Sequence, residues 1–319
     1  MKNIAIIGSG SFGCALANVL SINNNVKIWS FKEEEKSKIN EEKTCMFLNG
    51  SKLNEKIICY TNYKDVIEKS EYIFLVTPSN IIRNTIKNIK SYINNQKIII
   101  CSKGIEKGNN KLLSEVVTEE INNEVGVLSG PSIAKEVINY EPCKVTFASN
   151  NQIFKEEIKS IFAGSNMSLE FNNDMIGTEL GGTLKNIIAL ASGVLDGLNL
   201  GLNIKSVLIT RGLDEIKMLG KKMGATDETF YGLSGLGDLI VTCMSENSRN
   251  KSAGILIAKG KDIDDIKNEI GMVVEGLDAL IVAQDLSLKY DLKLPIINSL
   301  YDIIYNKKDS KIIIKAISD

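Results

Sequence analysis

Ile4-Ala5-Ile6-Ile7-Gly8-Ser9-Gly10-Ser11-Phe12-Gly13 is the stretch that predicts the fold of the first half of the chain. An apolar run typical of a strand precedes the glycines, and the residues after them have the apolar spacing of a helix. A Gly-x-Gly-x-x-Gly loop in this setting is typical of a dinucleotide site. Gly8 makes the tight turn, Gly10 lets the backbone approach the pyrophosphate, and Gly13 lets the helix pack on the strand. The free amides at the start of the helix would bind the phosphates.

Strand-like and helix-like segments alternate through the rest of the first half, which predicts a parallel sheet covered by helices on both faces. After about Phe171 the strand signals fade and five long helical patterns follow, at 175–195, 203–223, 251–258, 272–290 and 296–305. We therefore expect an α/β fold in which a Rossmann-like doubly wound sheet is followed by an all-helical domain. Residues 1–172 would form the dinucleotide-binding domain and residues 173–319 the helical substrate-binding domain. The strand-like segments are 3–8, 26–29, 56–61, 72–77, 97–102, 125–129 and 144–149.

The composition is ordinary for a soluble globular protein, with 44% hydrophobic and 24% charged residues. The formal net charge is −1, so no global field attracts nucleic acid or a membrane surface. The longest uncharged stretch, residues 3–26, is interrupted by Gly, Ser and Asn and does not fit a membrane span. No signal-peptide pattern precedes the first strand, and the six cysteines form no Cys-x-x-Cys pair. We expect a cytoplasmic protein without disulfides that is not embedded in a membrane and binds no nucleic acid.

A nicotinamide dinucleotide implies hydride transfer to a carbonyl, and the carbonyl oxygen then needs a proton partner. The chain contains no histidine, which excludes an imidazole in that role and makes a zinc site unexpected. Lys185 lies in an apolar helical stretch directly after Gly181 and Gly182. A partly buried lysine has a lowered pKa and exchanges a proton near neutrality. Taken alone, Lys185 is better explained as a surface lysine whose stem lies along an amphipathic helix, so its neighbours matter.

Several other polar residues lie where a substrate site is expected. Lys103 follows one predicted strand, and Gly130 and Ser132 follow another. Ligands bind outside the carboxyl ends of the strands in open α/β sheets. In the helical half, Asp238 ends a Gly-Leu-Gly turn. The run Ser248-Arg249-Asn250 combines a hydroxyl, a guanidinium and an amide, which suits a phosphate monoester.

The end of the second strand leaves the choice between NAD and NADP open. NAD sites often have an acidic residue there, hydrogen-bonded to the ribose hydroxyls. Here Ser30, Phe31 and Lys32 occupy the region. Lys32 would pair with the 2′-phosphate of NADP, or it is a surface lysine in a charge run. Residues 33–35 are all Glu, but they follow too late in the sequence to be expected at the ribose.

Eight short motifs occur in an order that is highly specific when they are taken together. They are Gly-Ser-Gly-Ser-Phe-Gly at 8–13, Val-Thr-Pro-Ser at 76–79, Ser-Lys-Gly-Ile-Glu at 102–106, Ser-Gly-Pro-Ser-Ile-Ala at 129–134, Gly-Gly-Thr-Leu-Lys-Asn at 181–186, Gly-Leu-Gly-Asp-Leu at 235–239, Asn-Ser-Arg-Asn at 247–250 and Val-Val-Glu-Gly at 273–276. In this combination the chain resembles the bacterial NAD(P)-dependent glycerol-3-phosphate dehydrogenases nearly from end to end. The resemblance implies a Rossmann domain followed by a helical domain of the 6-phosphogluconate dehydrogenase C-terminal type.

The resemblance also implies a role for each candidate residue. Lys185 resembles the family's proton acceptor in glycerol 3-phosphate oxidation, and Lys103 and Asp238 complete the catalytic set. The implied substrate contacts are Lys103, Gly130, Ser132, Lys185, Asp238, Ser248, Arg249 and Asn250. The implied cofactor contacts are Gly8, Gly10, Ser11, Phe12, Gly13, Phe31, Lys32, Pro78, Lys103, Ala134, Arg249, Val273 and Glu275. Phe31 departs from the family, which often has a basic residue or His there, and this affects cofactor preference.

Our hypothesis is a dehydrogenase that reduces dihydroxyacetone phosphate to glycerol 3-phosphate for phospholipid synthesis, with NAD or NADP as cofactor and no metal. Lys185 would donate the proton; Lys103 would lower its pKa and Asp238 would oppose that shift. A homodimer is expected by analogy. One alternative is a β-hydroxyacid dehydrogenase or ketopantoate-type reductase, which acts on carboxylates. The other is a non-catalytic dinucleotide sensor.

Overall fold

The computed structural model describes residues 1–318. The chain forms two compact units. Unit 1 comprises Met1–Ser102 and Leu113–Met175, and unit 2 comprises Lys103–Leu112 and the residues from Ile176 onward. The chain therefore leaves unit 1 after Ser102 and returns to it at Leu113, so that Lys103 folds with the helical half of the molecule.

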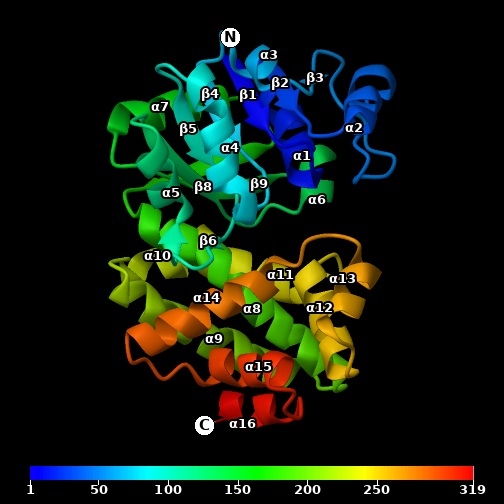
Figure 1. The fold of residues 1–319 in the computed structure, drawn as a ribbon, viewed down its shortest axis with the longest axis vertical. Helices are drawn as coiled ribbons and strands as arrows, with labels where there is room; N and C mark the ends of the chain where they lie inside the picture. Colours follow the sequence, from blue (N-terminus) through cyan, green and yellow to red (C-terminus); the bar gives the residue numbers. More distant parts are fainter. Residues whose placement is uncertain (319) are drawn as a thin grey trace. The chain divides into compact units, whose positions relative to one another are not determined.

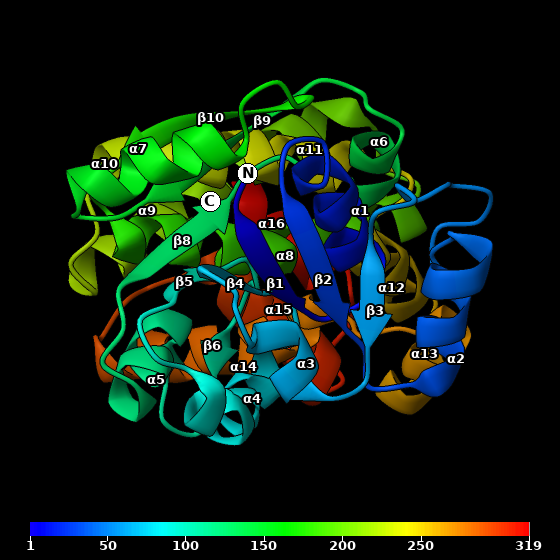
Figure 2. The same ribbon diagram turned by 90° about the horizontal axis from the view of Figure 1, so that it is seen from above.

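Unit 1 is built on an eight-stranded sheet with the strand order β10-β9-β8-β5-β4-β1-β2-β3 (Figures 1 and 2). β1 lies inside the sheet and pairs in parallel with β2 on one side and β4 on the other. The strands are β1 (Asn3–Ile7), β2 (Asn25–Trp29), β3 (Ile58–Tyr60), β4 (Tyr72–Leu75), β5 (Lys97–Ile100), β8 (Val125–Ser129), β9 (Cys143–Ala148) and β10 (Met167–Asn172). The predicted doubly wound Rossmann-like sheet is confirmed.

One edge of the sheet differs from the expected all-parallel arrangement. β8 and β9 pair antiparallel, and β10 then pairs in parallel with β9. Strand direction was not predictable here, because a short apolar run looks the same in either direction when both of its faces are covered. β10 was not predicted, because most of its residues are only half-buried and its sequence lacks a continuous apolar run.

Helices cover both faces of this sheet, as the alternating side chains of β1 require. Ala5 and Ile7 belong to the core beneath α3 (Tyr63–Ile67), α4 (Ile82–Ile89) and α5 (Leu113–Glu120). Ile4 and Ile6 belong to the opposite core, beneath α1 (Ser11–Leu20), α6 (Ala134–Ile138) and α7 (Gln152–Ile161). Figure 2 shows α3, α4 and α5 on one side of the strands and α1 and α6 on the other. The remaining helical segments of this unit are α2 (Glu33–Ser37), η1 (Lys38–Glu42), η2 (Ser79–Ile81) and η3 (Lys90–Tyr92).

Unit 2 is helical and is organised around α8 (Met175–Gly197), which is buried along nearly its whole length. Its apolar residues, among them Leu184, Ile187 and Leu190, belong to the hydrophobic core of this unit. The other helices of this unit are α9 (Leu202–Lys222), α10 (Asp227–Tyr231), η4 (Leu233–Gly237), α11 (Asp238–Met244), α12 (Arg249–Ala258), α13 (Ile263–Ile270), α14 (Glu275–Lys289), α15 (Pro295–Tyr305) and α16 (Ile312–Ser318). The five predicted long helices are confirmed, whereas the helices of five to eight residues were not predicted.

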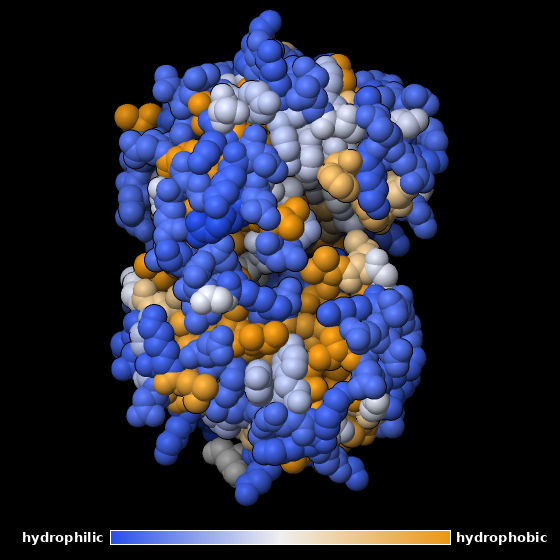
Figure 3. Space-filling view, in the orientation of Figure 1, coloured by the Kyte–Doolittle hydropathy of each residue, from blue (hydrophilic) through white to orange (hydrophobic). Residues whose placement is uncertain are grey.

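A short hairpin completes unit 2. β6 (Ile105–Glu106) and β7 (Lys111–Leu112) pair antiparallel, and Ile105 and Leu112 join the core that surrounds α8. On the face shown in Figure 3, hydrophilic side chains predominate on each unit, and apolar side chains gather on the helical unit around α12 and α14. Within residues 1–318 no helix combines the length and the apolar character needed to cross a membrane. The six cysteines lie in this part of the chain and form no disulfide there.

Candidate functional site

The predicted site residues of unit 1 lie at one edge of its sheet. Gly8 follows β1, Pro78 follows β4, and Gly130 follows β8. These strands belong to the parallel part of the sheet, so their carboxyl ends share one edge. This is the edge at which open α/β folds bind ligands.

The glycine loop has the geometry that phosphate binding requires. Gly8 has a φ of +126°, and a Cβ there would lie 2.9 Å from the carbonyl oxygen of Val76. A Cβ on Gly13 would lie 2.0 Å from the carbonyl oxygen of Gly8, so α1 can approach β1 only with glycine at this position. By contrast, a Cβ on Gly10 would meet no atom of residues 1–318 within 4 Å. Protein packing therefore explains Gly8 and Gly13, whereas no packing contact within residues 1–318 requires glycine at position 10.

The start of α1 also fits an anion. Its N-cap residue, Gly10, makes no side-chain cap, and the first amide that bonds back into the helix is that of Cys14, to the Gly10 carbonyl. The amides of Ser11, Phe12 and Gly13 therefore point out of the helix end, where the helix dipole favours negative charge. These residues fit the pyrophosphate of a dinucleotide.

The loop after β8 shares this edge. Gly130 has a φ of +144°, and a Cβ there would lie 3.0 Å from the Cα of Val145. The hydroxyl of Ser132 donates to the Gly130 carbonyl at 3.1 Å, and Ala134 is the first residue of α6. The buried hydroxyls of Thr77 and Ser129 have no hydrogen-bond partner within residues 1–318. Buried polar atoms in native proteins nearly always have partners, so this edge has capacity for polar ligand atoms.

At the end of β2, the structure differs from one expectation. Phe31 is 82% exposed and Lys32 is exposed, as surface residues beside a ligand would be. Glu35, however, does not lie too far along the chain to reach this position. α2 begins at once after Lys32 and folds Glu35 back, so that its carboxylate accepts hydrogen bonds from Ser30 and Ser9. The one-turn helix α2 makes the difference, because it turns the chain back towards the end of β2.

Unit 2 brings Lys185, Lys103 and Asp238 into direct contact. Lys185 projects from α8 and donates to one carboxylate oxygen of Asp238, the first residue of α11. Lys103, at the start of the β6–β7 segment, donates to the other oxygen at 2.5 Å. Lys185 also donates to the hydroxyl of Thr242 at 2.7 Å. The side chain of Asp238 is 1% exposed and that of Lys185 is 8% exposed, so the charges interact with little screening by water.

The two lysines of this cluster have different pKa shifts. Burial lowers the pKa of Lys185 from 10.5 to about 8; Asp238 opposes the shift and Lys103 adds to it. Burial also acts to lower the pKa of Lys103, but the attraction of Asp238 outweighs it, and the pKa is raised above the usual value. Lys185 is therefore the member of the pair that exchanges a proton near neutrality, while Lys103 stays an ammonium.

A chain of amide contacts links this cluster to the predicted phosphate residues. Asn186, next to Lys185, donates to the carboxylate of Glu275 at 3.3 Å and accepts from the side-chain amide of Asn250 at 2.8 Å. The oxygen of Asn250 accepts from the Gly276 amide at 2.9 Å. Both ends of the Asn250 amide are thus occupied, and it braces α8, α12 and α14 against one another.

Arg249 lies beside this network with donors to spare. One of its guanidinium N–H groups donates to the carbonyl of Val273 at 3.0 Å. It forms no ion pair within residues 1–318, and it is exposed. A guanidinium has five N–H donors, so most remain for an anionic ligand. Ser248 has a structural role: its hydroxyl accepts from the Lys251 amide at 3.3 Å and caps α12.

The glycine before Lys185 is explained by packing. A Cβ on Gly181 would lie 2.5 Å from the carbonyl oxygen of Ser234, where η4 crosses α8. The close approach of η4 to α8 therefore accounts for glycine at position 181. The close crossing matters for the site, because η4 leads directly into Asp238 and sets the carboxylate against α8.

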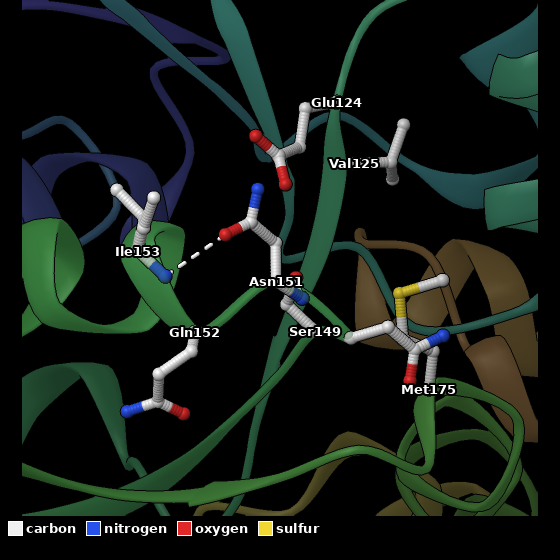
Figure 4. A pocket seen from close by; sticks show the side chains of 8 residues that line it. Glu124, Val125, Ser149, Asn151, Gln152, Ile153 and Met175 are labelled. Atoms are coloured by element: carbon white, nitrogen blue, oxygen red, sulfur yellow. Dashed lines mark hydrogen bonds between the residues drawn. The ribbon is translucent and has the colours of Figure 1, made fainter.

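A cavity of about 610 Å³ in unit 1 lies away from these residues. Figure 4 shows that Glu124, Ser149 and Asn151 line it, with Asn151 accepting from the Ile153 amide at the start of α7. Ser149 follows β9 and Glu124 precedes β8, which runs the opposite way. This cavity therefore adjoins the amino end of β8, opposite the edge that holds the glycine loop. A second cavity, of about 420 Å³ in unit 2, has Arg249 in its wall together with Glu246 and Glu269.

Three residues in these clusters were not singled out from the sequence. Thr242 lies four residues after Asp238, a helical spacing that places both side chains on one face of α11. Asn186 directly follows Lys185 in the motif, which was a usable signal. Glu35 was discounted by its distance along the chain from the end of β2.

Two family models match the chain. The model of the N-terminus of NAD-dependent glycerol-3-phosphate dehydrogenase matches residues 3–155, and the model of the C-terminus of the same enzyme matches residues 174–315. Together they cover the glycine loop and the lysine cluster.

Individual relatives agree with these models. A glycerol-3-phosphate dehydrogenase [NAD(P)+] of Clostridium botulinum is 42% identical over 315 residues, which cover 98% of this chain and 96% of the relative. The crystal structure of a glycerol-3-phosphate dehydrogenase from Coxiella burnetii superposes with a TM-score of 0.94 at 35% identity, covering 98% of both chains. A ketopantoate reductase of Ralstonia eutropha covers 99% of both chains with a TM-score of 0.64, but at 12% identity it shares the fold alone.

Proposed function

Because this chain belongs to the family of NAD-dependent glycerol-3-phosphate dehydrogenases, we propose that it reduces dihydroxyacetone phosphate to glycerol 3-phosphate. Membership confirms the predicted resemblance and the predicted class, an NAD(P)-dependent oxidoreductase. It also argues against the ketopantoate-type alternative, because this chain shares only its fold with the ketopantoate reductase. The observation that carries the proposal is the contact of Lys185 and of Lys103 with the buried carboxylate of Asp238.

Lys185 is the proposed proton donor. With a pKa of about 8 it is mostly an ammonium at pH 7, yet it releases its proton far more readily than an ordinary lysine. In the reduction it protonates the oxygen of the ketone; in the reverse direction the neutral amine accepts the proton of the alcohol. Asp238 and Thr242 hold the ammonium in place by hydrogen bonds on one side, so its third N–H is left for the substrate oxygen.

The proposed role of Lys103 is electrostatic. It stays charged and shares the carboxylate of Asp238 with Lys185, so the cluster of two cations and one anion carries a net positive charge. Such a cluster attracts a phosphorylated substrate and stabilises negative charge on the ketone oxygen as the reaction proceeds. Arg249 is proposed to bind the phosphate, with Asn250 holding α12 in position; Gly130, Ser132 and Ser248 remain proposed substrate contacts.

The glycine-loop edge of unit 1 is proposed to bind the cofactor. The room at Gly10 and the uncapped start of α1 support this assignment for the pyrophosphate. When bound, NADH or NADPH supplies the hydride that reduces the ketone carbon. Further proposed contacts are Ser11, Phe12, Phe31, Lys32, Pro78, Ala134, Val273 and Glu275. We keep residues 1–172 and 173–319 as the proposed dinucleotide-binding and substrate-binding domains, with the difference that Lys103–Leu112 fold with unit 2.

We also propose a cellular setting for this activity. The enzyme would act in the cytoplasm as a homodimer and supply glycerol 3-phosphate for phospholipid synthesis. Separation of the purified protein by sedimentation velocity tests the dimer, and a single monomeric species at micromolar concentration would contradict it.

The decisive test is a reductase assay with dihydroxyacetone phosphate, run with NADH and with NADPH. Lys185→Met keeps an unbranched side chain of similar length but removes the ammonium group that donates the proton. The kcat should therefore fall by roughly 10²–10⁴-fold. Binding of NADH, followed by its fluorescence, should change little. Lys293→Met, at an exposed lysine of the same unit, is the control. Near-normal turnover of Lys185→Met would remove this residue from the mechanism, and wild-type protein that binds NADH but turns over no substrate would favour a sensor.

A further inference from the structure

Glu35 is a buried carboxylate placed between the glycine loop and the end of β2. The hydroxyl of Ser30, the residue after β2, donates to its Oε2 at 2.7 Å, and the hydroxyl of Ser9, inside the glycine loop, donates to the same oxygen. Glu35 is 8% exposed. It forms no ion pair with a lysine or arginine within residues 1–318. The two serines therefore hold this carboxyl group against the glycine loop.

The end of the second strand is where a dinucleotide site binds the adenosine ribose. In Rossmann folds the adenosine ribose lies beside the glycine loop at the end of the second strand, and an acidic residue about 20 positions on accepts hydrogen bonds from its hydroxyls. Glu35 follows Gly13 by 22 residues. Both serines bind Oε2, whereas Oε1 makes no hydrogen bond within residues 1–318. Oε1 thus keeps its acceptor capacity for a ribose hydroxyl.

Two lysines close to Glu35 in the sequence would favour NADP over NAD, because an ammonium attracts a 2′-phosphate. Lys36 is paired with Glu33 at 2.9 Å, which neutralises it. Lys32 is exposed, so its charge is mobile and screened by solvent and salt. Glu35 is buried and fixed by two hydroxyls, so its field is screened less. We therefore expect the carboxylate of Glu35 to outweigh the ammonium of Lys32 in the electrostatic field that a bound ribose would meet.

We propose that Glu35 makes the chain select NAD(H) over NADP(H). Its carboxylate accepts from the ribose of NAD(H) and repels the 2′-phosphate of NADP(H). The proposal rests on the proposed function only in so far as unit 1 takes a nicotinamide dinucleotide. It replaces Phe31 and Lys32 by Glu35 as the residue that decides cofactor preference.

The test is calorimetric titration of the full chain with ADP-ribose and with its 2′-phosphorylated form. Wild-type protein should bind ADP-ribose at least about tenfold more tightly, since a fixed like charge opposes the added phosphate. Glu35→Gln keeps the size of the side chain and removes its charge, and should reduce this ratio at least about fivefold, mainly through tighter binding of the phosphorylated form. Glu34→Gln, a neighbouring exposed glutamate, should keep the wild-type ratio.

The ratio separates selectivity from a structural role. A residue that only supports the loop would weaken both ligands equally when replaced, leaving the ratio unchanged, and that result would overturn the proposal. Wild-type protein that binds the phosphorylated form as tightly as ADP-ribose would also overturn it, whether or not the variant folds. The expected binding ratios without turnover of dihydroxyacetone phosphate would instead contradict the proposed function and leave this inference standing.

Discussion

At the scale of single residues, burial lowers the pKa of Lys185, and the neighbouring charge of Lys103 lowers it further. Because its positive charge helps to lower the pKa of Lys185 to about 8, replacing Lys103 by Met should raise that pKa. Wild-type reduction should decline as the pH rises through about 8, since the donor loses its proton, and oxidation should rise over the same range. In Lys103→Met both transitions should move to higher pH, beyond any loss of rate.

The pH dependence of kcat in each direction measures this shift. Lys293→Met, which removes an exposed lysine of the same unit, should reproduce the wild-type profile. If the transition of Lys103→Met stays in place or moves to lower pH, Lys103 does not act on Lys185 in this way.

At the scale of elements, the glycine loop separates packing from ligand binding. A Cβ on Gly13 would collide with the Gly8 carbonyl and push α1 from β1, so Gly13→Ala should destabilise the protein by about 1–3 kcal/mol. Gly10→Ala has open space around its Cβ and should leave the melting temperature close to that of the wild type while weakening NADH binding. Thermal melting and NADH titration distinguish the two; equal loss of stability in both variants would contradict the assignment of Gly10 to the ligand.

The junction of α9 and α15 is predicted to make stability depend on pH. Glu215 is buried and accepts hydrogen bonds from the amides of Ile296 and Ile297, at 2.6 and 3.0 Å. Burial raises its pKa to about 7, whereas these two amides oppose the shift. The folded state therefore binds this proton more tightly than the unfolded chain does, and the stabilisation is lost as the pH rises through about 7.

Denaturant unfolding at several pH values tests this junction. From pH 5 to pH 8 the contribution of Glu215 to the free energy of unfolding should fall by about 2.5 kcal/mol. Glu215→Gln should flatten this dependence, and Glu55→Gln, at an exposed glutamate, should not. A steep dependence that persists in Glu215→Gln would assign it to another group.

At the scale of the whole molecule, each unit has its own hydrophobic core, and the cofactor is proposed to bind through the glycine loop of unit 1. Binding should therefore stabilise unit 1 directly, by about 2.7 kcal/mol at a concentration one hundred times Kd. Hydrogen exchange with ADP-ribose should show added protection around residues 8–13 and at the end of β2. Gly10→Ala is the matched control and should show little protection at the same concentration; protection confined to unit 2 would place the ligand elsewhere.

The sequence alone determined the strand–glycine–helix unit, the change from alternating segments to long helices, and the family. These features are local, because the spacing of apolar residues and of glycines is a property of neighbouring residues, and tertiary packing did not override it. Likewise, the composition alone showed that the proton donor is not an imidazole, because the chain contains no histidine.

Only the tertiary structure decided which side chains meet. Lys103, Lys185 and Asp238 are far apart in the sequence, and only the packing of α8, α11 and the β6–β7 segment brings them together in a buried cluster. The direction of β9 and β10 and the return of Glu35 to Ser9 were likewise decided by chain reversals that short apolar or charged runs do not encode. The physical reason is common to all three: charges and strands interact through space, and their distances depend on turns whose geometry is set by the whole packed unit.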